Sequence, residues 1–381
     1  MKTLILPLIL FLLSNSPLLA QNTSKTLLFI GSYTEGEIDT GIYVYEFDAN
    51  NGSLNQLAAI PNLVNPSFLT LSPNGKFLYA CTETKLEQDG SVSAFEINPK
   101  TGQLKFLNKE PAGGRNPVHV SVHKSNRFVI NSNYTDASIS VFKTKKDGRL
   151  NAYKQLLKFE GAGPLKKRQS AAHIHSAVFS PNGKFLFAPD LGADLIRIFK
   201  FQRSKAAPLK IIDSLLVKSA AGSGPRHFVF HPNKKFGYCM EELSGSITAF
   251  SYKRGKLRRM DSYFSYSKKQ ASYGSSDIHI SPDGKFLYAS NRWYDENTIS
   301  IFEINQPTGR LKFIMHQATF GDHPRSFVID PSGHFLLVAN QASGNIVTFK
   351  RDFKTGLLTK LTGEIQHHLP SSLKMKSYNR L

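Results

Sequence analysis

Short stretches of alternating apolar and polar residues, each with one aligned aromatic residue, recur along this chain. They appear seven times, as GIYVYEF, SVSAFEI, SISVFKT, LIRIFKF, SITAFSY, TISIFEI and NIVTFKR. The aligned aromatic residues are spaced by 47 to 57 residues: Tyr45, Phe95, Phe142, Phe199, Phe250, Phe302 and Phe349. Alternation with a period of two, carried by β-branched and aromatic side chains, predicts β-strands in all seven places.

A tight-turn sequence recurs six times between two further alternating stretches, as in LSPNGKFLYA (71–80) and ISPDGKFLYA (280–289). Proline followed by Asn, Asp or Ser, and then usually Gly, favours a turn between antiparallel strands. The stretch before the turn appears a seventh time as PSSLKMK (370–376), without the strand that should follow it. The segment TLLFIGSY (26–33), at the other end of the chain, supplies that strand.

Repeats of about fifty residues with four short strands each predict a β-propeller. We therefore expect an all-β, seven-bladed β-propeller, with residues 26–376 as a single domain. Pairing of the C-terminal strand with the N-terminal strand closes the ring and removes sheet edges that favour aggregation. Cys81 and Cys239 lie in blades separated by two others, so we expect two free thiols and no disulfide.

The first twenty residues have the features of a secretory signal peptide. Lys2 precedes an apolar run from Leu4 to Leu13, and the small residue Ala20 stands before Gln21. A basic start, a short apolar run and a small residue are typical of such signals, and the run is too short to span a bilayer. We expect cleavage of residues 1–20, no membrane span afterwards, and a periplasmic or secreted protein. Retention as a membrane tether is the alternative.

The chain is basic, with a formal net charge of +20. Such a charge favours anionic partners without selecting one, and we expect no nucleic-acid partner. The sequence has no P-loop and no Gly-X-Ser-X-Gly turn, which argues against a P-loop nucleotide hydrolase and a serine esterase. We expect no metal and no other cofactor. The alternative is a calcium ion in the channel, held by Asp190, Asp194, Asp277 and Glu242.

Propeller geometry places one set of polar residues around one mouth of the central channel. In each blade, the start of the innermost strand and the end of the next strand lie on the same face. The innermost strands contribute Asn116, His173, His175, Arg226, His227, Asp277, His279, His323 and Arg325, and the second strands contribute Tyr33, Glu83, Asn133, Asp190, Glu241, Glu242, Arg292 and Asn340. Polar and ionisable residues that converge in this way predict an active site.

Several strings of sequence resemble the seven-bladed β-propeller lactonases. These strings are IHSAVFSP (174–181), GSGPRHFVFHP (222–232), SDIHISPDGKFLYASNR (276–292) and HPRSFVIDPSG (323–333). The family includes the bacterial propeller-type 6-phosphogluconolactonases, and the fungal carboxymuconate cyclases are related to it. The resemblance implies a lactone hydrolase that needs no metal.

The resemblance also implies roles for three catalytic residues. Arg226 is expected to hold the carbonyl oxygen or a carboxylate of the substrate. His175 is expected to act as the general base or as a lactone-binding donor, and Glu242 is a second candidate for the base. Each residue has a structural alternative, because strand histidines often only satisfy hydrogen bonds and Arg226 and Glu242 could form a simple ion pair.

Four further residues are expected to bind the substrate: Asp277, His279, Arg292 and Arg325. For His279, structural hydrogen bonding is the favoured alternative, whereas Arg325 is a candidate for an anionic substituent. Trp293 replaces the small residue that the family shows after Asn-Arg, and we expect it to wall off part of the mouth. The segment 161–173 lengthens one blade and carries Lys166, Lys167 and Arg168. We interpret it as a solvated loop, with a cationic flap over the substrate as the alternative.

The sequence thus predicts a lactonase, similar to 6-phosphogluconolactonase, that acts on a small, anionic, sugar-derived lactone. Export favours an unphosphorylated lactone, because sugar phosphates are cytoplasmic metabolites. Two alternatives remain open. One is a muconate-type lactonising cycloisomerase that uses the same residues, and the other is a non-catalytic propeller that binds a polyanion or a protein partner.

Overall fold

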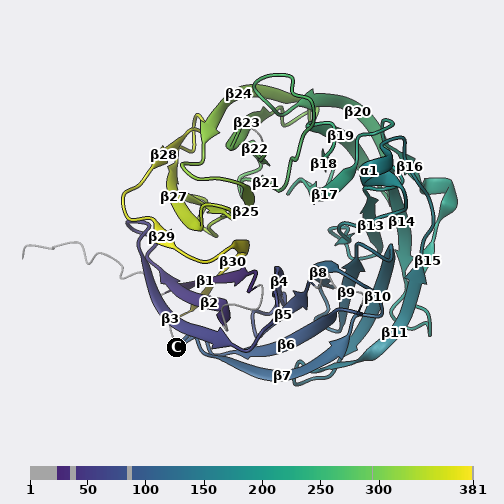
Figure 1. Ribbon diagram of the computed structural model, residues 1–381, viewed down its shortest axis with the longest axis horizontal. Helices are drawn as coiled ribbons and strands as arrows, with labels where there is room; N and C mark the ends of the chain where they lie inside the picture. Colours follow the sequence, from purple (N-terminus) through teal and green to yellow (C-terminus); the bar gives the residue numbers. More distant parts are fainter. Residues whose placement is uncertain (1–23, 35–39, 84–87, 294, 380–381) are drawn as a thin grey trace, which may run out of the picture.

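The computed structural model describes residues 24–34, 40–83, 88–293 and 295–379, which form seven antiparallel sheets arranged as blades in a ring (Figure 1). This arrangement confirms the expected all-β, seven-bladed propeller. The expected signal peptide, residues 1–20, lies outside the described residues. Within the described part of the chain, no helix is long and apolar enough to cross a membrane.

The first blade joins the two ends of the chain. Leu28 of one terminal strand lies opposite Met375 of the other in antiparallel register, and Figure 1 shows these purple and yellow strands side by side. The C-terminal strand is therefore the innermost strand of the first blade, which confirms the predicted closure. From the outside inwards, the strands of this blade are β3 (Leu54–Pro61), β2 (Thr40–Phe47), β1 (Ser24–Ser32) and β30 (Pro370–Asn379).

The other six blades each run outwards from an innermost strand in sequence order. The second blade consists of β4 (Phe68–Leu71), β5 (Phe77–Thr82), β6 (Ser91–Ile97) and β7 (Leu104–Pro111). The third consists of β8 (Pro117–Val122), β9 (Phe128–Asn133), β10 (Ser138–Thr144) and β11 (Leu150–Lys158). The fourth consists of β12 (Val178–Phe179), β13 (Phe185–Asp190), β14 (Leu195–Phe201), β15 (Leu209–Ile211) and β16 (Val217–Lys218).

Two short helical turns accompany the fourth blade: α1 (Lys166–Gln169) and η1 (Asp213–Leu215). The fifth blade consists of β17 (Pro225–Phe230), β18 (Phe236–Glu241), β19 (Ser246–Lys253) and β20 (Lys256–Phe264). The sixth consists of β21 (Ile278–Ile280), β22 (Phe286–Asn291), β23 (Thr298–Ile304) and β24 (Leu311–Ala318). The seventh consists of β25 (Pro324–Ile329), β26 (Phe335–Asn340), β27 (Asn345–Arg351), β28 (Leu358–Lys360) and β29 (Ile365–Gln366).

Apolar side chains fill the spaces between neighbouring blades. All seven aromatic residues aligned in the sequence are buried, and Phe142, for example, packs in one cluster with Phe77 and Tyr79 of the preceding blade. Burial of each such side chain contributes about 1.5–3 kcal/mol relative to exposure. Because the apolar faces are used between blades, the starts of the innermost strands remain free to carry polar residues into the channel.

Candidate functional site

Four innermost strands start in the same way, with a residue of positive φ, a proline and then a β-bulge. The residues of positive φ are Asn116 (59°), Gly224 (63°), His323 (63°) and Leu369 (40°). The register of pairing skips the residue after each proline, so the bulged residues are Val118, Arg226, Arg325 and Ser371. A bulge changes the direction of a side chain relative to the strand. All four bulged residues line cavities in the channel.

The bulged residues form one ring around the channel. A second ring consists of the residues that directly follow the second strand of a blade. In six blades this residue lines the same pocket: Tyr33, Glu83, Tyr134, Glu242, Arg292 and Gln341. Side chains alternate in direction along a strand, so the last residue of each second strand points away from the pocket. Four residues expected at the mouth do not line the pocket for this reason: Asn133, Asp190, Glu241 and Asn340. Asn133 and Asn340 instead donate hydrogen bonds to the carbonyl oxygens of Ala112 and Thr319.

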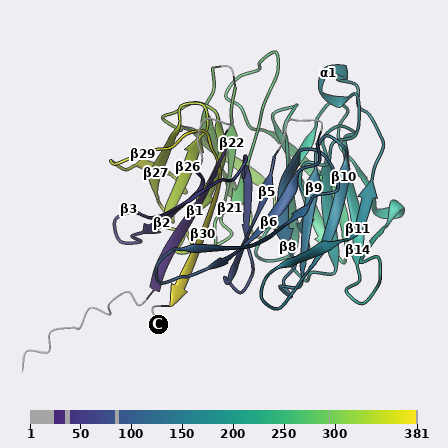
Figure 2. The ribbon, with the colours of Figure 1, turned by 60° about the horizontal axis from the view of Figure 1, so that its bottom comes forward.

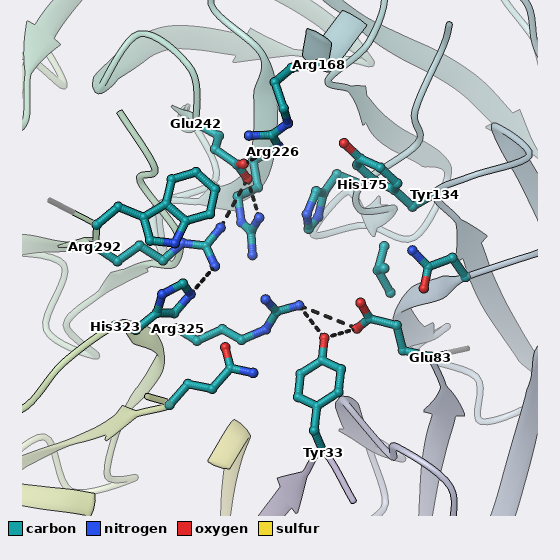
Figure 3. A pocket seen from close by; sticks show the side chains of 14 residues that line it. Tyr33, Glu83, Tyr134, Arg168, His175, Arg226, Glu242, Arg292, His323 and Arg325 are labelled. Atoms are coloured by element: carbon teal, nitrogen blue, oxygen red, sulfur yellow. Dashed lines mark hydrogen bonds and ion pairs between the residues drawn. The ribbon is translucent and has the colours of Figure 1, made fainter. Parts of the chain in front are cut away.

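The two rings enclose a pocket with a volume of about 300 Å³ at one mouth of the channel (Figure 3). This volume is at the lower end of the range for small-molecule sites. Five of the seven residues predicted for catalysis or binding line it, namely His175, Arg226, Glu242, Arg292 and Arg325. Asp277 lines a smaller cavity farther along the channel, and His279 lines neither cavity.

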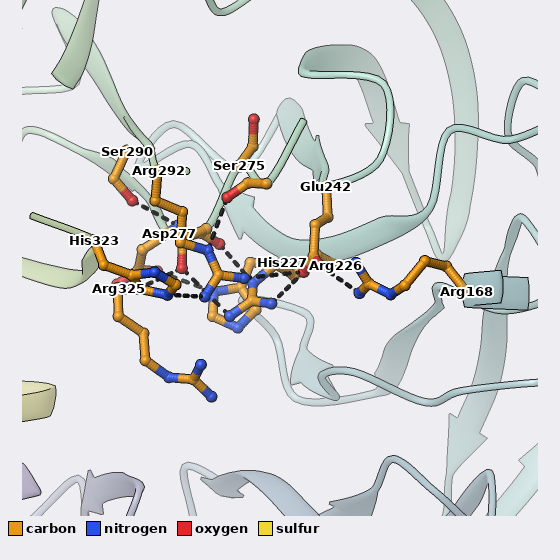
Figure 4. Close-up of polar contacts among 12 residues, drawn as sticks. Arg168, Arg226, His227, Glu242, Ser275, Asp277, Ser290, Arg292, His323 and Arg325 are labelled. Carbon is orange, nitrogen blue, oxygen red and sulfur yellow. Dashed lines mark hydrogen bonds and ion pairs between the residues drawn. The ribbon is translucent and has the colours of Figure 1, made fainter. Parts of the chain in front are cut away.

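Three guanidinium groups converge on the carboxylate of Glu242 (Figure 4). Arg226 Nη1 and Arg292 Nη2 both contact Oε2, the latter at 3.4 Å, and Arg168 Nη2 donates to Oε1 at 2.6 Å. Burial opposes ionisation of Glu242, but the three arginines outweigh it and hold the pKa of this carboxyl below its usual range. The carboxylate is therefore ionised with both oxygens occupied, which makes it a weak proton acceptor.

Further hydrogen bonds fix the planes of the two buried arginines. Arg226 Nε donates to the carbonyl oxygen of Ser276 at 3.0 Å, and Arg292 Nε donates to that of Gly274 at 2.8 Å. Arg292 Nη1 also donates to His323 Nε2 at 2.8 Å. Guanidinium groups held in this way can bind a carbonyl or carboxylate oxygen without first having to be ordered.

A second cluster faces this one across the pocket. The hydroxyl of Tyr33 donates to Glu83 and accepts a hydrogen bond from Arg325 Nη2 at 2.7 Å. Figure 3 shows the Arg325 guanidinium between this pair and the Glu242 cluster. Burial raises the pKa of Tyr33 well above its usual value, so the hydroxyl stays neutral.

His175 enters the pocket from the fourth blade, next to the Glu242 cluster. Its backbone N–H donates to the carbonyl oxygen of Pro189 at 3.0 Å, and its side chain is buried. Burial and the nearby Arg226 hold the pKa of His175 well below its usual range. Nδ1 of the ring is enclosed and has no hydrogen-bond partner among the described residues, so nothing offsets the cost of charging it. The imidazole is therefore neutral, and its low pKa makes it a weaker base than an ordinary histidine.

Comparison with known proteins agrees with this geometry. Residues 27–375 match the family model described as "Lactonase, 7-bladed beta-propeller". The chain belongs to this lactonase family. A 6-phosphogluconolactonase of Formosa agariphila is 47% identical over 352 residues, which cover 92% of this chain and all of that protein. A 6-phosphogluconolactonase of Bacillus subtilis is 35% identical, over 92% of this chain and 98% of that protein.

Among solved structures of the family, a periplasmic gluconolactonase of Pseudomonas aeruginosa is similar with a TM-score of 0.87. Its sequence is 32% identical, and the match covers 92% of this chain and 99% of that one. The similarity therefore extends over the whole ring and includes all seven blades.

The other two residues predicted to bind substrate, Asp277 and His279, belong to a hydrogen-bond network that joins three blades. Asp277 accepts from Ser326 Oγ at 3.1 Å and pairs with His227 Nδ1 at 3.0 Å and His279 Nε2 at 3.2 Å. In the part of the chain that the structure describes, no group of three or more His, Cys, Asp or Glu side chains could hold a metal ion. The contact of His279 with Asp277 corresponds to the structural alternative raised for His279.

Three lining residues were not predicted from the sequence: Val118, Tyr134 and Gln341. For Tyr134 and Gln341 the signal was present, because they occupy the same place after a second strand as Glu242 and Arg292. Val118 is apolar and was missed because only polar residues were considered. The interpretation of segment 161–173 as a solvated loop is wrong for Arg168, which contacts Glu242 and is closer to the alternative of a cationic flap, although Lys166 and Lys167 are exposed.

Proposed function

We propose that this protein hydrolyses a sugar-derived lactone in the pocket around Glu242. The observation that carries the proposal is the placement of neutral His175 beside two buried guanidinium groups, those of Arg226 and Arg292, whose counter-ion is Glu242. Family relatives named 6-phosphogluconolactonase and gluconolactonase support a sugar lactone as the substrate. A protein that binds partners only through its outer surface would have no need of this buried set.

In the first step, a water molecule attacks the carbonyl carbon of the lactone while His175 accepts its proton. Negative charge grows on the former carbonyl oxygen as the new C–O bond forms. Arg226 and Arg292 are fixed donors that stabilise this oxyanion. Glu242 keeps the two guanidinium planes in place, which makes it a positioning residue in this mechanism.

In the second step, the tetrahedral intermediate collapses and the bond from the carbonyl carbon to the ring oxygen breaks. The protonated imidazole of His175 returns its proton to that leaving oxygen. The products are a free hydroxyl and a carboxylic acid, which releases its proton to solvent and becomes a carboxylate, so lactone plus water gives one hydroxy acid. The carboxylate forms next to Arg226 and Arg292, whose charge suits it.

The charge of the pocket supports an anionic substrate. Its lining includes Arg168, Arg226, Arg292 and Arg325, against only the two carboxylates of Glu83 and Glu242. We propose a periplasmic or secreted location, which rests on the signal-like first twenty residues and is supported by the periplasmic gluconolactonase among the similar structures.

The test is a pH-stat assay of the purified mature protein with a panel of gluconolactone, 6-phosphogluconolactone, glucarolactone and muconolactone. Base uptake above the spontaneous rate with one of the sugar lactones, lost in Arg226→Ala, supports the proposal. Turnover of muconolactone alone would instead favour the cycloisomerase. Absence of turnover with the whole panel would contradict an enzymatic role in lactone chemistry.

A further inference from the structure

The segment that lengthens the fourth blade brings a fourth arginine into the pocket. It contains α1, and Figure 2 shows this helix beyond the strands at one end of the propeller. From α1, Arg168 extends to the Glu242 carboxylate, where its Nη2 lies 2.6 Å from Oε1 (Figure 4). The other three arginines of the pocket come from the regular framework of the blades, so Arg168 is the one that this insertion adds.

The position of α1 depends on the residue after Arg168. Gln169 is fully buried, and its Nε2 donates to the carbonyl oxygen of Leu191 and to Asp194 Oδ1, both at 2.8 Å. Asp194 in turn accepts from the backbone N–H groups of Gly222 and Gly224, just before the strand of Arg226. The helix is therefore held against the pocket by hydrogen bonds of Gln169 that do not involve Arg168.

The charge of Arg168 is in excess of what Glu242 requires. The single negative charge of Glu242 already faces two buried arginines, whose side chains are 4% and 3% exposed, whereas that of Arg168 is 35% exposed. The ring of Trp293 lies beside the Arg168 guanidinium, whose central carbon is 5.7 Å from the ring centre. Arg168 is thus held at the solvent side of the pocket, where an incoming ligand meets it first.

We propose that Arg168 is a specificity-determining residue that selects lactones with an anionic substituent, either a phosphate ester or a carboxylate. The inference rests on the proposed lactone hydrolysis and adds the residue that sets its substrate class. The reacting carbonyl lies at Arg226 and Arg292, deeper in the pocket. A lactone bound there directs its exocyclic end towards the rim, where Arg168 supplies a charged donor on an exposed side chain.

The experiment compares three lactones: gluconolactone, which is neutral, 6-phosphogluconolactone, which carries a phosphate, and glucarolactone, which carries a carboxylate. Values of kcat/KM are measured for the wild type, Arg168→Gln and Lys167→Gln. Lys167→Gln is the matched control, because it removes one positive charge from the same helix. Lys167 is exposed and does not line the pocket. The two anionic lactones show which anion Arg168 accepts.

We expect the wild type to prefer at least one anionic lactone over gluconolactone. Arg168→Gln should lower kcat/KM for that lactone by about tenfold or more, through KM, because a charge-assisted hydrogen bond is lost. Gluconolactone hydrolysis by Arg168→Gln should fall much less than hydrolysis of that anionic lactone, and all values for Lys167→Gln should change little. An equal loss on neutral and anionic lactones would show that Arg168 acts through Glu242, and an unchanged preference would show that it plays no part. Either result overturns the inference.

Failure of the proposed lactone hydrolysis can be distinguished from failure of the inference on Arg168. If the wild type hydrolyses none of the lactones, the proposed function is wrong, and binding still tests Arg168. In that case, calorimetric titration with 6-phosphogluconate and with gluconate replaces the assay. Arg168→Gln should then reduce the affinity for 6-phosphogluconate but not for gluconate, and equal affinities in both variants would overturn the inference.

Discussion

Arg226 and Glu242 form an ion pair inside the pocket although they are 16 residues apart in the sequence. Pro225 and Glu241 are opposite each other in the antiparallel pair β17–β18, and each member of the ion pair lies one residue further along. The backbone N–H of Glu242 donates to the carbonyl oxygen of Gly224 at 2.8 Å, which ties the two strand ends together. The backbone therefore delivers both side chains to the same mouth.

Replacement of Arg226 by alanine should abolish most lactone hydrolysis and leave the fold intact. The loss of a donor to the oxyanion is expected to reduce kcat/KM by two to three decades, or about 3–4 kcal/mol. Glu242 keeps Arg168 and Arg292 as partners, so no uncompensated charge is left buried. The measurements are pH-stat kinetics and the thermal unfolding midpoint.

The control for this variant is Arg149→Ala, which removes an arginine from an exposed ion pair with Asp147. Exposed pairs contribute about 0–1 kcal/mol, so neither activity nor stability should change appreciably. Wild-type turnover in Arg226→Ala would show that the site is assigned incorrectly. A large fall in its unfolding midpoint would show that the arginine is structural.

The pH dependence of kcat/KM should identify the general base. His175 acts in its neutral form, so activity should fall as the pH decreases through the pKa of this residue, which burial and Arg226 hold well below the usual range. The rate should therefore stay constant from neutral pH to below the range in which an ordinary histidine titrates. His175→Gln should lose about two to four decades of activity, and its residual rate should lack this acid limb.

Glu242→Gln serves as the comparison for His175. We expect it to lower activity, because Arg226 and Arg292 lose their counter-ion, but to retain the acid limb. If the limb instead disappears in Glu242→Gln and persists in His175→Gln, Glu242 is the base and the proposed mechanism is wrong in this respect.

Removal of residues 369–381 should prevent stable folding. The deletion takes away β30, the innermost strand of the first blade, and leaves the edge of β1 without a partner. Unpaired edges of this kind favour aggregation. Leu373→Ala is the milder test, since this fully buried residue should cost about 2–5 kcal/mol when truncated. A soluble deletion variant with the wild-type unfolding midpoint would contradict the closure.

The free energy of unfolding should decrease as the pH is lowered from 7 to 5. Burial lowers the pKa of His367 to about 4, and an unfolded histidine titrates near 6.5. Between these values the unfolded chain binds more protons, so stability is lost as the pH falls, by roughly 1–2 kcal/mol for this residue. Urea titrations at both pH values should show a smaller decrease for His367→Gln, and an identical decrease would argue against this origin.

Cys81 and Cys239 are both buried and free in the structure, as the blade spacing predicts. Burial raises the pKa of both thiols, so they should react slowly with thiol reagents in the folded protein. After unfolding without a reductant, labelling followed by mass spectrometry should find two free thiols per chain. A protein without free thiols would contradict the placement of the two blades.

The fold could be predicted from the sequence because each repeat has its own local pattern of strand and turn residues. Each blade has its own alternating strands and an aromatic residue such as Phe142 or Phe302, six blades have the tight turn, and the unpaired stretch at 370–376 shows how the ring closes. Parts of the site were less predictable. Asn340 and Gln341 are adjacent, and because side chains alternate in direction only Gln341 points into the pocket. To predict this, one must know the residue at which the strand ends.

The contact between Arg168 and Glu242 could not be predicted for a different reason, although Arg168 belonged to the segment considered as a cationic flap. Arg168 lies in a segment without a counterpart in the other blades, so the repeat gives no register for it. Its contact with Glu242 depends on the long-range hydrogen bonds of Gln169 to Leu191 and Asp194. Likewise, the spacing of Arg226, Arg292 and Glu242 indicates one mouth but not that three guanidinium groups share one carboxylate.

The proline and β-bulge at the start of four innermost strands place side chains in the channel that take no part in the packing between the blades. Val118, Arg226 and Arg325 occupy the same position in three different blades, yet one is apolar and two are cationic. The apolar clusters between the blades do not include any of them. Each blade that starts in this way thus offers one interchangeable position in the channel, so selectivity can change by single substitutions while the ring that carries them stays the same.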